Sequence, residues 1–387
     1  MIQAINLAGW MPEVQPDGAL SSLTLAAFRR RQILRILVRD VLGFAALPEV
    51  TEELSNLADT IINAACRAVR RELEAKFGVP RLADGSACGF SVLALGKLGG
   101  RELNYSSDID LMFLYEEAGY TDGAQSLTHR EFFQKLSNRL TAMLGTYTPE
   151  GMIYRVDLRL RPEGRLGEVC ISLQAAKDYY EKRARDWELQ MLIKARASAG
   201  DAEPARSFLE WVQPMIYSTT LDFSAVEQMS EARERLSDKL AARTRPGGTD
   251  VKLARGGIRD IEFLVQCLQR VHGGREVWLR NSATLLALNR PRDKDLLSGT
   301  EYSRLVNAYQ FLRHLEHRLQ FAEDRQTHAL PENGDELDLV ARRMPAGQLG
   351  EESTTESLLR HLNEHLEHVQ EIYERIVHAQ QPMYYSQ

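Results

Sequence analysis

The hydrophobic periodicity of the chain changes twice along its length, and this constrains the fold more than any other feature. Residues 24–42 and 52–77 carry apolar side chains at three- to five-residue spacing, which predicts two amphipathic helices. Residues 90–160 instead contain short apolar runs rich in strand formers, with one helical stretch between them. From about Ser172 the pattern is helical again. We therefore expect a mostly helical α+β fold with a small mixed sheet.

The central segment is expected to form a compact core. Its predicted strands cover Phe90–Leu95, Ile109–Tyr115 and Met152–Leu160, and a helix is predicted over Thr128–Leu144. Further helices are predicted over residues 173–198, 224–243, 258–271, 302–325 and 354–379. The apolar spacing in the last of these favours a helical bundle. The expected domains are an N-terminal helical segment (1–85), a mixed α/β core (86–172) and a helical bundle domain (173–387).

The composition is that of an ordinary soluble protein and argues against several classes. Lys and Arg number 48 and Asp and Glu 54, so the net charge is −6 and no nucleic-acid partner is expected. No apolar run approaches the roughly 18 to 20 residues of a membrane span, and the first residues lack the pattern of a signal peptide. The four cysteines form no CxxC pair, which argues against a zinc site or a disulfide framework. We expect a cytoplasmic protein without a membrane partner.

Two aspartates open the second predicted strand. Asp108 and Asp110 flank Ile109, and side chains two residues apart share one face of a strand. Two carboxylates this close repel each other unless a cation lies between them. Oxygen ligands with space for water and substrate suit Mg²⁺. Because Asp pairs are also common on protein surfaces, the neighbouring motifs decide how this pair is interpreted.

The third predicted strand adds another carboxylate and several guanidinium groups. Strict alternation places Asp157 on one face with Arg155, Arg159 and Arg161, and apolar residues on the other face. Guanidinium groups match phosphate oxygens in geometry and charge. We interpret this face as a phosphate site beside the aspartates. The alternative is a solvated face of ion pairs.

A glycine-rich turn precedes the aspartates. Its backbone N–H groups, together with nearby hydroxyl groups, can approach an anion closely. The candidate residues for binding nucleotide or phosphate are Gly96, Lys97, Gly99, Gly100, Ser106 and Ser107. The turn matches neither a P-loop nor a dinucleotide-binding fingerprint.

The order of these elements resembles a known superfamily. A glycine turn, ten residues, Asp-x-Asp and a distant third Asp is the arrangement of the polymerase β-like nucleotidyltransferases. Most members of that superfamily have Ser or Gly in place of Lys97. The aspartates are therefore aligned more securely than the turn.

Four longer motifs make the resemblance more specific. In chain order they are GKLGGRELNYSSDIDLMFLY (96–115), YRVDLRLRPEGR (154–165), RDWELQMLIKAR (185–196) and KLARGGIRDIEFLVQ (252–266). The same order is found in the glutamine synthetase adenylyltransferases, also called adenylyl-transferring/adenylyl-removing enzymes. The chain resembles this family over residues 29–379.

The resemblance implies a function. Family members carry two related nucleotidyltransferase halves. The N-terminal half removes AMP from a tyrosine of glutamine synthetase by phosphorolysis, which releases ADP, and the C-terminal half adds AMP from ATP. The single Asp-x-Asp core of this chain and its motifs SSDID and GGIRDIEF are similar to the removing half, as a fragment or as a single-half protein. The implied partners are glutamine synthetase, phosphate, an adenine nucleotide and the PII signal protein.

The resemblance also implies roles for individual residues. Asp108, Asp110 and Asp157 would hold one or two Mg²⁺ ions, and Arg159 and Arg161 would bind phosphate. Candidates outside this first set are Glu102, Glu188, Lys194, Arg196, Arg259 and Glu262.

Some of these further candidates have a structural alternative. Glu188 is expected behind the metal or as an anchor for Arg196, and a structural ion pair is the alternative. Arg259 is expected near the phosphate, and helix packing is the alternative. Glu102 is expected to brace the loop without touching nucleotide.

Two other functions stay open. One is the reverse chemistry, ATP-dependent adenylylation of a protein tyrosine. The other is a regulatory module that binds a nucleotide or PII without turnover. The presence of all three aspartates argues against the second, since such a module has no need of metal ligands.

Three histidines near the end of the chain could in principle bind zinc. His361, His365 and His368 have a spacing that places them along one helix face. No HExxH motif accompanies them, and we interpret them as part of a solvated face.

Overall fold

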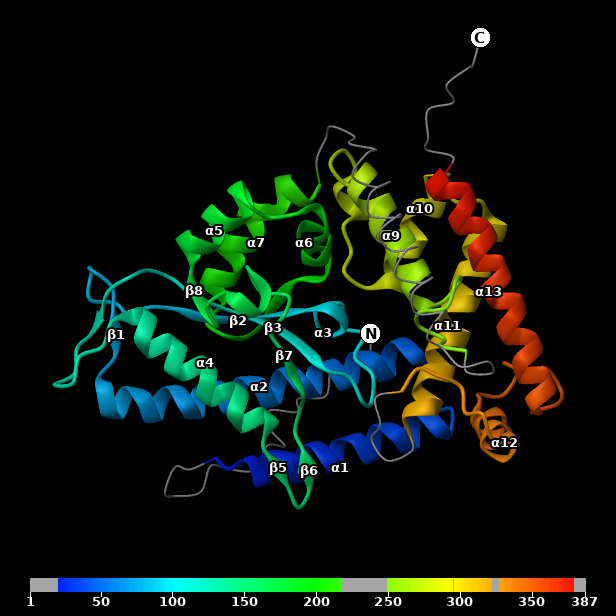
Figure 1. Ribbon diagram of the computed structural model, residues 1–387, viewed down its shortest axis with the longest axis horizontal. Coiled ribbons are helices and arrows are strands. Elements are labelled where there is room, and N and C mark those ends of the chain that lie inside the picture. Colours follow the sequence, from blue (N-terminus) through cyan, green and yellow to red (C-terminus); the bar gives the residue numbers. More distant parts are fainter. Residues whose placement is uncertain (1–19, 218–248, 295, 322–326, 379–387) are drawn as a thin grey trace, which may run out of the picture. The chain divides into compact units, whose positions relative to one another are not determined.

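The computed structural model describes residues 20–217, 249–294, 296–321 and 327–378 (Figure 1). The chain consists of two compact units, Met1–Asp40 with Pro48–Met215 and Val41–Leu47 with Ile216–Gln387. The domain boundaries predicted at residues 85 and 172 therefore both fall inside the first unit.

A mixed sheet, with five strands over the described residues, forms the centre of the first unit. Its strands are β2 (Phe90–Leu95), β3 (Ile109–Tyr115), β7 (Val156–Asp157), β8 (Cys170–Ser172) and β9 (Arg196–Gly200). β3 pairs antiparallel with β2 and parallel with both β7 and β8. β9 pairs antiparallel with the other edge of β2. The first two predicted strands are confirmed, and so is the mostly helical α+β fold class.

The third predicted strand is much shorter than expected. Within residues 152–160, only Met152, at the end of β6 (Gly151–Met152), and the two residues of β7 have strand conformation. The backbone N–H of Arg159 donates to Asp157 Oδ1 at 2.8 Å, so a turn begins directly after β7. A continuous strand to residue 160 is therefore wrong, because the aspartate side chain captures the backbone that would continue it.

The helix predicted over residues 173–198 is also interrupted. α5 (Leu173–Lys182) and α6 (Asp186–Met191) are followed by a short 3-10 helix, η3 (Leu192–Lys194), and then by β9. β9 has the sequence RASAG, which contains no typical strand former. Its conformation depends on pairing with β2, which the local sequence does not reveal. The expectation that the chain is helical from residue 173 onwards is wrong at β9.

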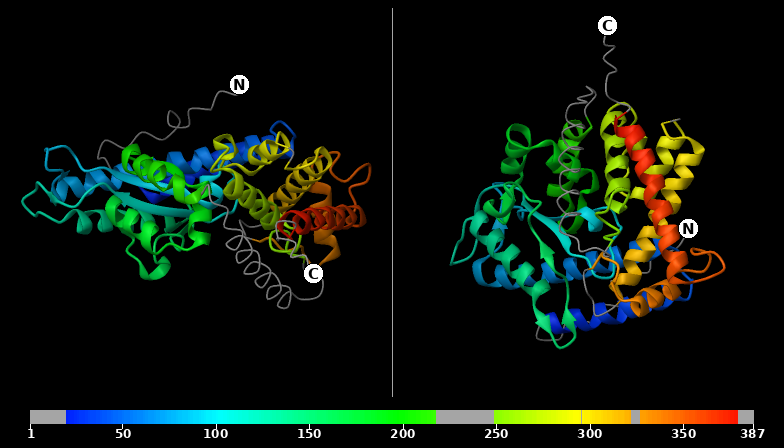
Figure 2. Two further views of the ribbon diagram at one scale, coloured as in Figure 1. Left: turned by 90° about the horizontal axis from the view of Figure 1, so that it is seen from above. Right: turned by 45° about the vertical axis from the view of Figure 1, so that its right-hand side comes forward.

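Helices cover both faces of this sheet. The helices α5, α6 and α7 (Ala202–Ile216) lie on one side and α2 (Leu47–Phe77) and α4 (His129–Gly145) on the other (Figures 1 and 2). α1 (Ser22–Val41), α2 and α4 confirm the predicted helices of this part of the chain. Two small pairings complete the unit: β1 (Pro80–Arg81) with β4 (Tyr120–Thr121), and β5 (Tyr147–Thr148) with β6.

Alternate residues of β2 face these two helical layers. Phe90 stacks on Phe113 of β3 and on Phe133 of α4, with ring centroids 6.0 and 5.5 Å apart. The next residue, Ser91, donates to the Asp201 carbonyl and accepts from the backbone N–H of Ala205 in α7. A strand buried on both faces accounts for the nearly continuous apolar sequence FSVLAL.

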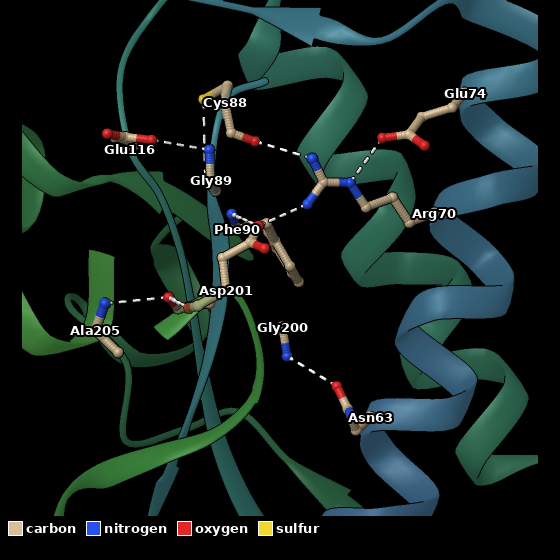
Figure 3. Close-up of polar contacts among 11 residues, drawn as sticks. Asn63, Arg70, Glu74, Cys88, Gly89, Phe90, Glu116, Gly200, Asp201 and Ala205 are labelled. Carbon is tan, nitrogen blue, oxygen red and sulfur yellow. Dashed lines mark hydrogen bonds and ion pairs between the residues drawn. The ribbon is translucent and has the colours of Figure 1, made fainter. Parts of the chain in front are cut away.

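A group of ion pairs fastens the sheet to α2 (Figure 3). Arg70 of α2 donates to Glu74 at 2.7 Å, to Asp201 at 2.6 Å and to the Cys88 carbonyl at 3.0 Å. Asp201 Oδ2 also accepts from the backbone N–H of Phe90 at 2.9 Å. One helix thus holds the start of β2 and the chain just after β9. For this reason the N-terminal helices belong to the same unit as the sheet.

The second unit is helical over its described residues. Its helices are α9 (Ile258–His272), α10 (Thr284–Arg292), α11 (Gly299–Gln320), α12 (Gly334–Arg343) and α13 (Thr355–His378). α9, α11 and α13 confirm the helices predicted over 258–271, 302–325 and 354–379, while the helix predicted over 224–243 lies outside the described residues. A shared apolar core includes Leu264, Leu312 and Leu362. None of the helices in the described ranges is long and apolar enough to cross a membrane.

His365 of α13 packs against a neighbouring helix, whereas His361 bonds within α13 itself. The ring of His365 lies 4.7 Å from that of Phe311 in α11, centroid to centroid. His361 Nδ1 lies 2.8 Å from the Ser357 carbonyl oxygen. Burial lowers the pKa of His365 to about 4, with smaller contributions from Glu364, which raises it, and from the neighbouring histidines, which lower it.

We predict that acid destabilises the second unit through His365. Its pKa is lower in the folded protein than the unfolded value of about 6.5, so the unfolded chain binds more protons between these values. The stabilisation is complete above about pH 6.5 and is lost as the pH falls towards 4. The melting temperature of His365→Gln should therefore fall less than that of the unsubstituted protein between pH 7 and pH 5. Equal falls in the two proteins would contradict this prediction.

Candidate active site

The three predicted aspartates meet where β3 pairs with β7. Asp110 and Asp157 are partners in this parallel pair, as are Ile109 and Val156. Paired residues of neighbouring strands project from the same face of a sheet, and Asp108 precedes Asp110 by two residues. The register of two strands from distant parts of the chain thus places carboxylates side by side.

Gly96 provides the space for one of these carboxylates. Leu95 pairs with Asp110, so α3 (Gly96–Gly99) begins directly beside that aspartate. A Cβ at position 96 would overlap the Asp110 carboxylate, and the backbone φ of +54° is itself in the left-handed region. Both conditions favour glycine. The packing of Asp110 is therefore a structural reason for Gly96, in addition to the predicted role in phosphate binding.

Two arginines form ion pairs with Asp108 and Asp157. Arg155 Nε donates to Asp108 Oδ1 at 2.7 Å, and its Nη2 donates to Ser106 Oγ at 3.0 Å. The Nε of Arg159 donates to both carboxylate oxygens of Asp157, at 3.0 and 2.8 Å, and its Nη2 donates to Oδ2 at 2.5 Å. The sequence placed Arg155 on the predicted phosphate face but gave no signal that it pairs with Asp108.

The electrostatics of the site keep Asp157 ionised. Partial burial by itself raises the pKa of Asp157, but the hydrogen bonds from the Arg159 side chain and backbone outweigh it and lower the pKa below its ordinary value. In return Asp157 raises the pKa of Arg159, with further contributions from Asp110 and Asp108. All three carboxylates therefore act on one guanidinium group.

Arg161 has a different environment from the one predicted. Its guanidinium group donates to the carbonyl oxygens of Leu158, Gly167 and Glu168, at 2.7, 2.9 and 3.0 Å. Burial lowers its pKa, and Asp157 acts in the opposite direction. The face shared by Arg155, Asp157, Arg159 and Arg161 required an unbroken strand and is wrong as a strand face. Arg161 instead holds the loop after β7 together, and its role in phosphate binding stays a prediction.

The glycine motif forms one helical turn. The backbone N–H of Gly100 donates to the Gly96 carbonyl at 3.0 Å, and that of Glu102 to the Lys97 carbonyl at 2.8 Å. A Cβ at Gly99 would overlap the Lys194 carbonyl oxygen, so this glycine permits close packing of α3 on η3. Lys97 and Ser107 are both partly exposed.

A buried ion pair lies beneath α3. Lys194 Nζ donates to Glu102 Oε2 at 2.9 Å, and the two side chains are only 8% and 7% exposed. The pair joins the loop after α3 to η3, in agreement with a bracing role for Glu102. The sequence did not indicate Lys194 as its partner.

Glu188 and Arg196 have separate structural partners. Glu188 accepts from the Tyr179 hydroxyl at 2.6 Å and from the backbone N–H of Arg185 at 2.9 Å, so it caps α6. Arg196 forms an ion pair with Asp59 of α2 at 2.7 Å. The alternative in which Glu188 anchors Arg196 is therefore wrong. Neither Tyr179 nor Asp59 had a sequence signal that marked it as a partner.

The remaining candidates belong to the second unit. Arg259 is exposed and Glu262 is half-buried, both on α9. The neighbouring Asp260 accepts from the backbone N–H of Gly256 at 2.8 Å and so stabilises the turn that starts the helix. The roles of Arg259 and Glu262 stay predictions.

The aspartates suit a divalent cation by their donor chemistry. Within the described ranges, no group of three His, Cys, Asp or Glu side chains is arranged as a ready metal cage. The carboxylates of Asp108 and Asp157 are held by guanidinium groups, which supply the positive charge that such a site requires. Hard oxygen donors of this kind are the ligands that Mg²⁺ prefers. The residues therefore have the donor chemistry for a divalent metal, which would compete with Arg155 and Arg159 for these carboxylates.

Comparison with known proteins identifies the family of the chain. The family described as glutamate-ammonia ligase adenylyltransferase matches residues 3–211, more than half of the 387 residues. The chain belongs to this family. Residues 224–377 match a second family, described as GlnD PII-uridylyltransferase. The resemblance inferred from the four motifs is confirmed.

Individual relatives extend the match over nearly the whole chain. A protein of Thioalkalivibrio sulfidiphilus named bifunctional glutamine synthetase adenylyltransferase/adenylyl-removing enzyme is 38% identical over 378 residues, which cover 98% of this chain and 38% of the relative. A protein of the same name from Nitrosomonas europaea is 40% identical over 359 residues, which cover 92% of this chain and 38% of the relative. The chain thus spans less than two fifths of the length of these relatives.

The buried pair beneath α3 leads to a stability prediction. Replacing Lys194 by Met removes the ammonium group that faces the buried carboxylate of Glu102, and breaking such a pair costs about 3 to 5 kcal/mol. Chemical denaturation should show a loss of this size in the free energy of unfolding.

Lys182 is the matched control for this experiment. It forms an ion pair with Asp178 on the surface of α5 and is 65% exposed. Lys182→Met should change the free energy of unfolding by less than about 1 kcal/mol. Similar losses in the two variants would show that the buried pair has no special importance.

Proposed function

We propose that this chain removes AMP from an adenylylated tyrosine of glutamine synthetase by phosphorolysis and releases ADP. The observation that carries the proposal is the pairing of Asp110 with Asp157 in β3 and β7, beside Asp108 and Arg159. Such a group of acids next to a basic side chain suits transfer at a phosphorus atom. The names of the relatives supply the protein substrate, since they include both adenylyltransferase and adenylyl-removing activity.

The proposed reaction exchanges one bond for another at the α-phosphorus. An oxygen of inorganic phosphate attacks this phosphorus, and the bond between the phosphorus and the tyrosyl oxygen breaks. The products are ADP and a tyrosine that recovers its proton from solvent. Phosphate is already an anion, so no strong general base is required. The phenolate is a fair leaving group, because the pKa of tyrosine is near 10.

The acids and the basic residues have separate roles in this proposal. Asp108, Asp110 and Asp157 would hold one or two Mg²⁺ ions, which supply charge neutralisation at the attacking and leaving oxygens. Arg159 binds the incoming phosphate or the phosphate of AMP, because it is exposed and carries a donor fork. Lys97, at the start of α3, provides a second positive charge.

The motifs favour removal of AMP over its addition. SSDID at residues 106–110 and GGIRDIEF at 256–263 resemble the removing half of the family. The alternative is ATP-dependent adenylylation of glutamine synthetase, which would release pyrophosphate. The match of residues 224–377 to a family named for PII uridylylation supports PII as a regulatory partner. A purely regulatory module is disfavoured, because it has no need of three carboxylates beside one another.

Product analysis tests the proposed reaction directly. Incubation of the chain with adenylylated glutamine synthetase, Mg²⁺ and phosphate should release ADP in amounts equal to the AMP lost from the protein. Incubation with unmodified glutamine synthetase and ATP should release no pyrophosphate. The opposite pair of results would establish the adenylylating alternative.

The aspartates should be indispensable for this release. Asp110→Asn and Asp157→Asn each remove a negative charge from the proposed metal site, and the rate of ADP release should fall roughly 100-fold or more. The control Asp178→Asn changes a half-exposed aspartate of α5 that pairs with Lys182 and should leave the rate within about twofold. Melting curves would show that all variants are folded. Unchanged ADP release in both site variants would refute the proposed site.

A further inference from the structure

Arg155 pairs with Asp108 and Arg159 pairs with Asp157, and the two arginine side chains differ in how firmly other contacts hold them. Arg155 also donates to Ser106, a residue that is 2% exposed, and the Arg155 side chain is 37% exposed. The Arg159 side chain is 61% exposed, and in the described part of the chain all of its hydrogen bonds are made to Asp157. Arg159 is therefore the more easily displaced of the two.

The Asp157 carboxylate cannot keep its hydrogen bonds to the Arg159 side chain and bind a metal ion at the same time. Both of its carboxylate oxygens accept hydrogen bonds from the Arg159 guanidinium group, and the carboxylate is only 13% exposed. A divalent cation at this carboxylate would use the same lone pairs and would repel the guanidinium group. The backbone hydrogen bond from Arg159 to Asp157 Oδ1 does not involve the side chain, so the turn can persist when the guanidinium group leaves.

We propose that Arg159 exchanges between two anionic partners, Asp157 in the metal-free protein and a phosphate group in the metal-bound protein. A divalent cation and phosphate then bind cooperatively, because each frees the partner that the other requires. This inference rests on the proposed function in placing the metal at Asp157. Arg159 thus competes with the metal for Asp157 and is a binding residue for phosphate.

Arg155 and Arg161 are held by more contacts than Arg159. Arg161 donates to three backbone carbonyl groups, and its departure would break all of these hydrogen bonds. Arg155 would have to release both Asp108 and Ser106. The Arg159 side chain can rotate into solvent without breaking any other hydrogen bond.

Thermodynamic linkage makes the exchange measurable. In the metal-free protein the Arg159 side chain competes with the metal, so the apparent metal affinity is lower than the intrinsic affinity of the carboxylates. Phosphate relieves this competition, and the coupling must be equal in both directions. A partly exposed ion pair of this kind corresponds to about a three- to tenfold change in affinity.

The test measures Mn²⁺ binding to the whole chain by electron paramagnetic resonance, without glutamine synthetase. Arg159→Met should bind Mn²⁺ about three- to tenfold more tightly than the unsubstituted chain when phosphate is absent. Added inorganic phosphate should tighten Mn²⁺ binding to the unsubstituted chain, after correction for the manganese–phosphate complex in solution. It should have little effect on Mn²⁺ binding to Arg159→Met.

Arg183 offers a matched control for the loss of a positive charge. Its side chain is 62% exposed and pairs at 2.5 Å with Glu163, which is not one of the proposed metal ligands. Arg183→Met should bind Mn²⁺ as the unsubstituted chain does and retain the effect of phosphate. An equal gain in affinity in Arg183→Met and Arg159→Met would overturn the proposal, because the effect would then be one of overall charge.

A third variant separates this proposal from the proposed function. Asp157→Asn should weaken Mn²⁺ binding. If it does so while Arg159→Met leaves both the Mn²⁺ affinity and the phosphate effect unchanged, the exchange is overturned and the metal site stands. If Asp157→Asn binds Mn²⁺ as well as the unsubstituted chain does, the metal site itself is overturned, and the exchange with it. Melting curves of the variants confirm that each is folded.

Discussion

Asp110 and Asp157 lie opposite each other in neighbouring parallel strands, and the residues of the candidate site must accommodate this concentration of negative charge. Carboxylates at adjacent positions on one sheet face repel each other unless cations or hydrogen-bond donors compensate them. Arg155 and Arg159 supply part of the compensation from the same segment that carries Asp157. Gly96 has no side chain, so the carboxylate of Asp110 can pack against it. The site thus combines charges that a soluble core would normally avoid.

Rigid elements hold these charges in place. β2 and β3 pair over six residues and are buried between helices on both faces. Arg70 of α2 fastens the start of β2 and the chain after β9, and the pair of Arg196 with Asp59 fastens the other end of β9. The buried pair of Lys194 and Glu102 connects α3 to the segment that leads into β9. The strands that carry Asp110 and Asp157 are therefore held by helices and by a neighbouring strand, while Arg159 stands on an exposed turn.

Features that the local sequence determines could be predicted, whereas features that depend on contacts elsewhere in the fold could not. The strands over residues 90–95 and 109–115 were predictable, because their apolar runs are long enough to show strand periodicity. The strand β9 could not be predicted, because its sequence RASAG forms a strand only by pairing with β2. The strand expected over 152–160 breaks because the carboxylate of Asp157 captures the backbone N–H of Arg159. A side chain that bonds to its own backbone overrides the alternation of polar and apolar residues.

The sequence by itself determined the chemistry available to the site: which residues are acids, that Asp108 and Asp110 are two residues apart at the start of a predicted strand, and that the ordered motifs belong to one enzyme family. Only the tertiary structure decided which acid lies beside which, since the register of β3 against β7 depends on hydrogen bonds between distant segments. It also decided the partners of the arginines. Arg159 turns back to Asp157, whereas Arg161 binds backbone carbonyl groups. Local spacing does not encode these partners, because they depend on where the chain turns.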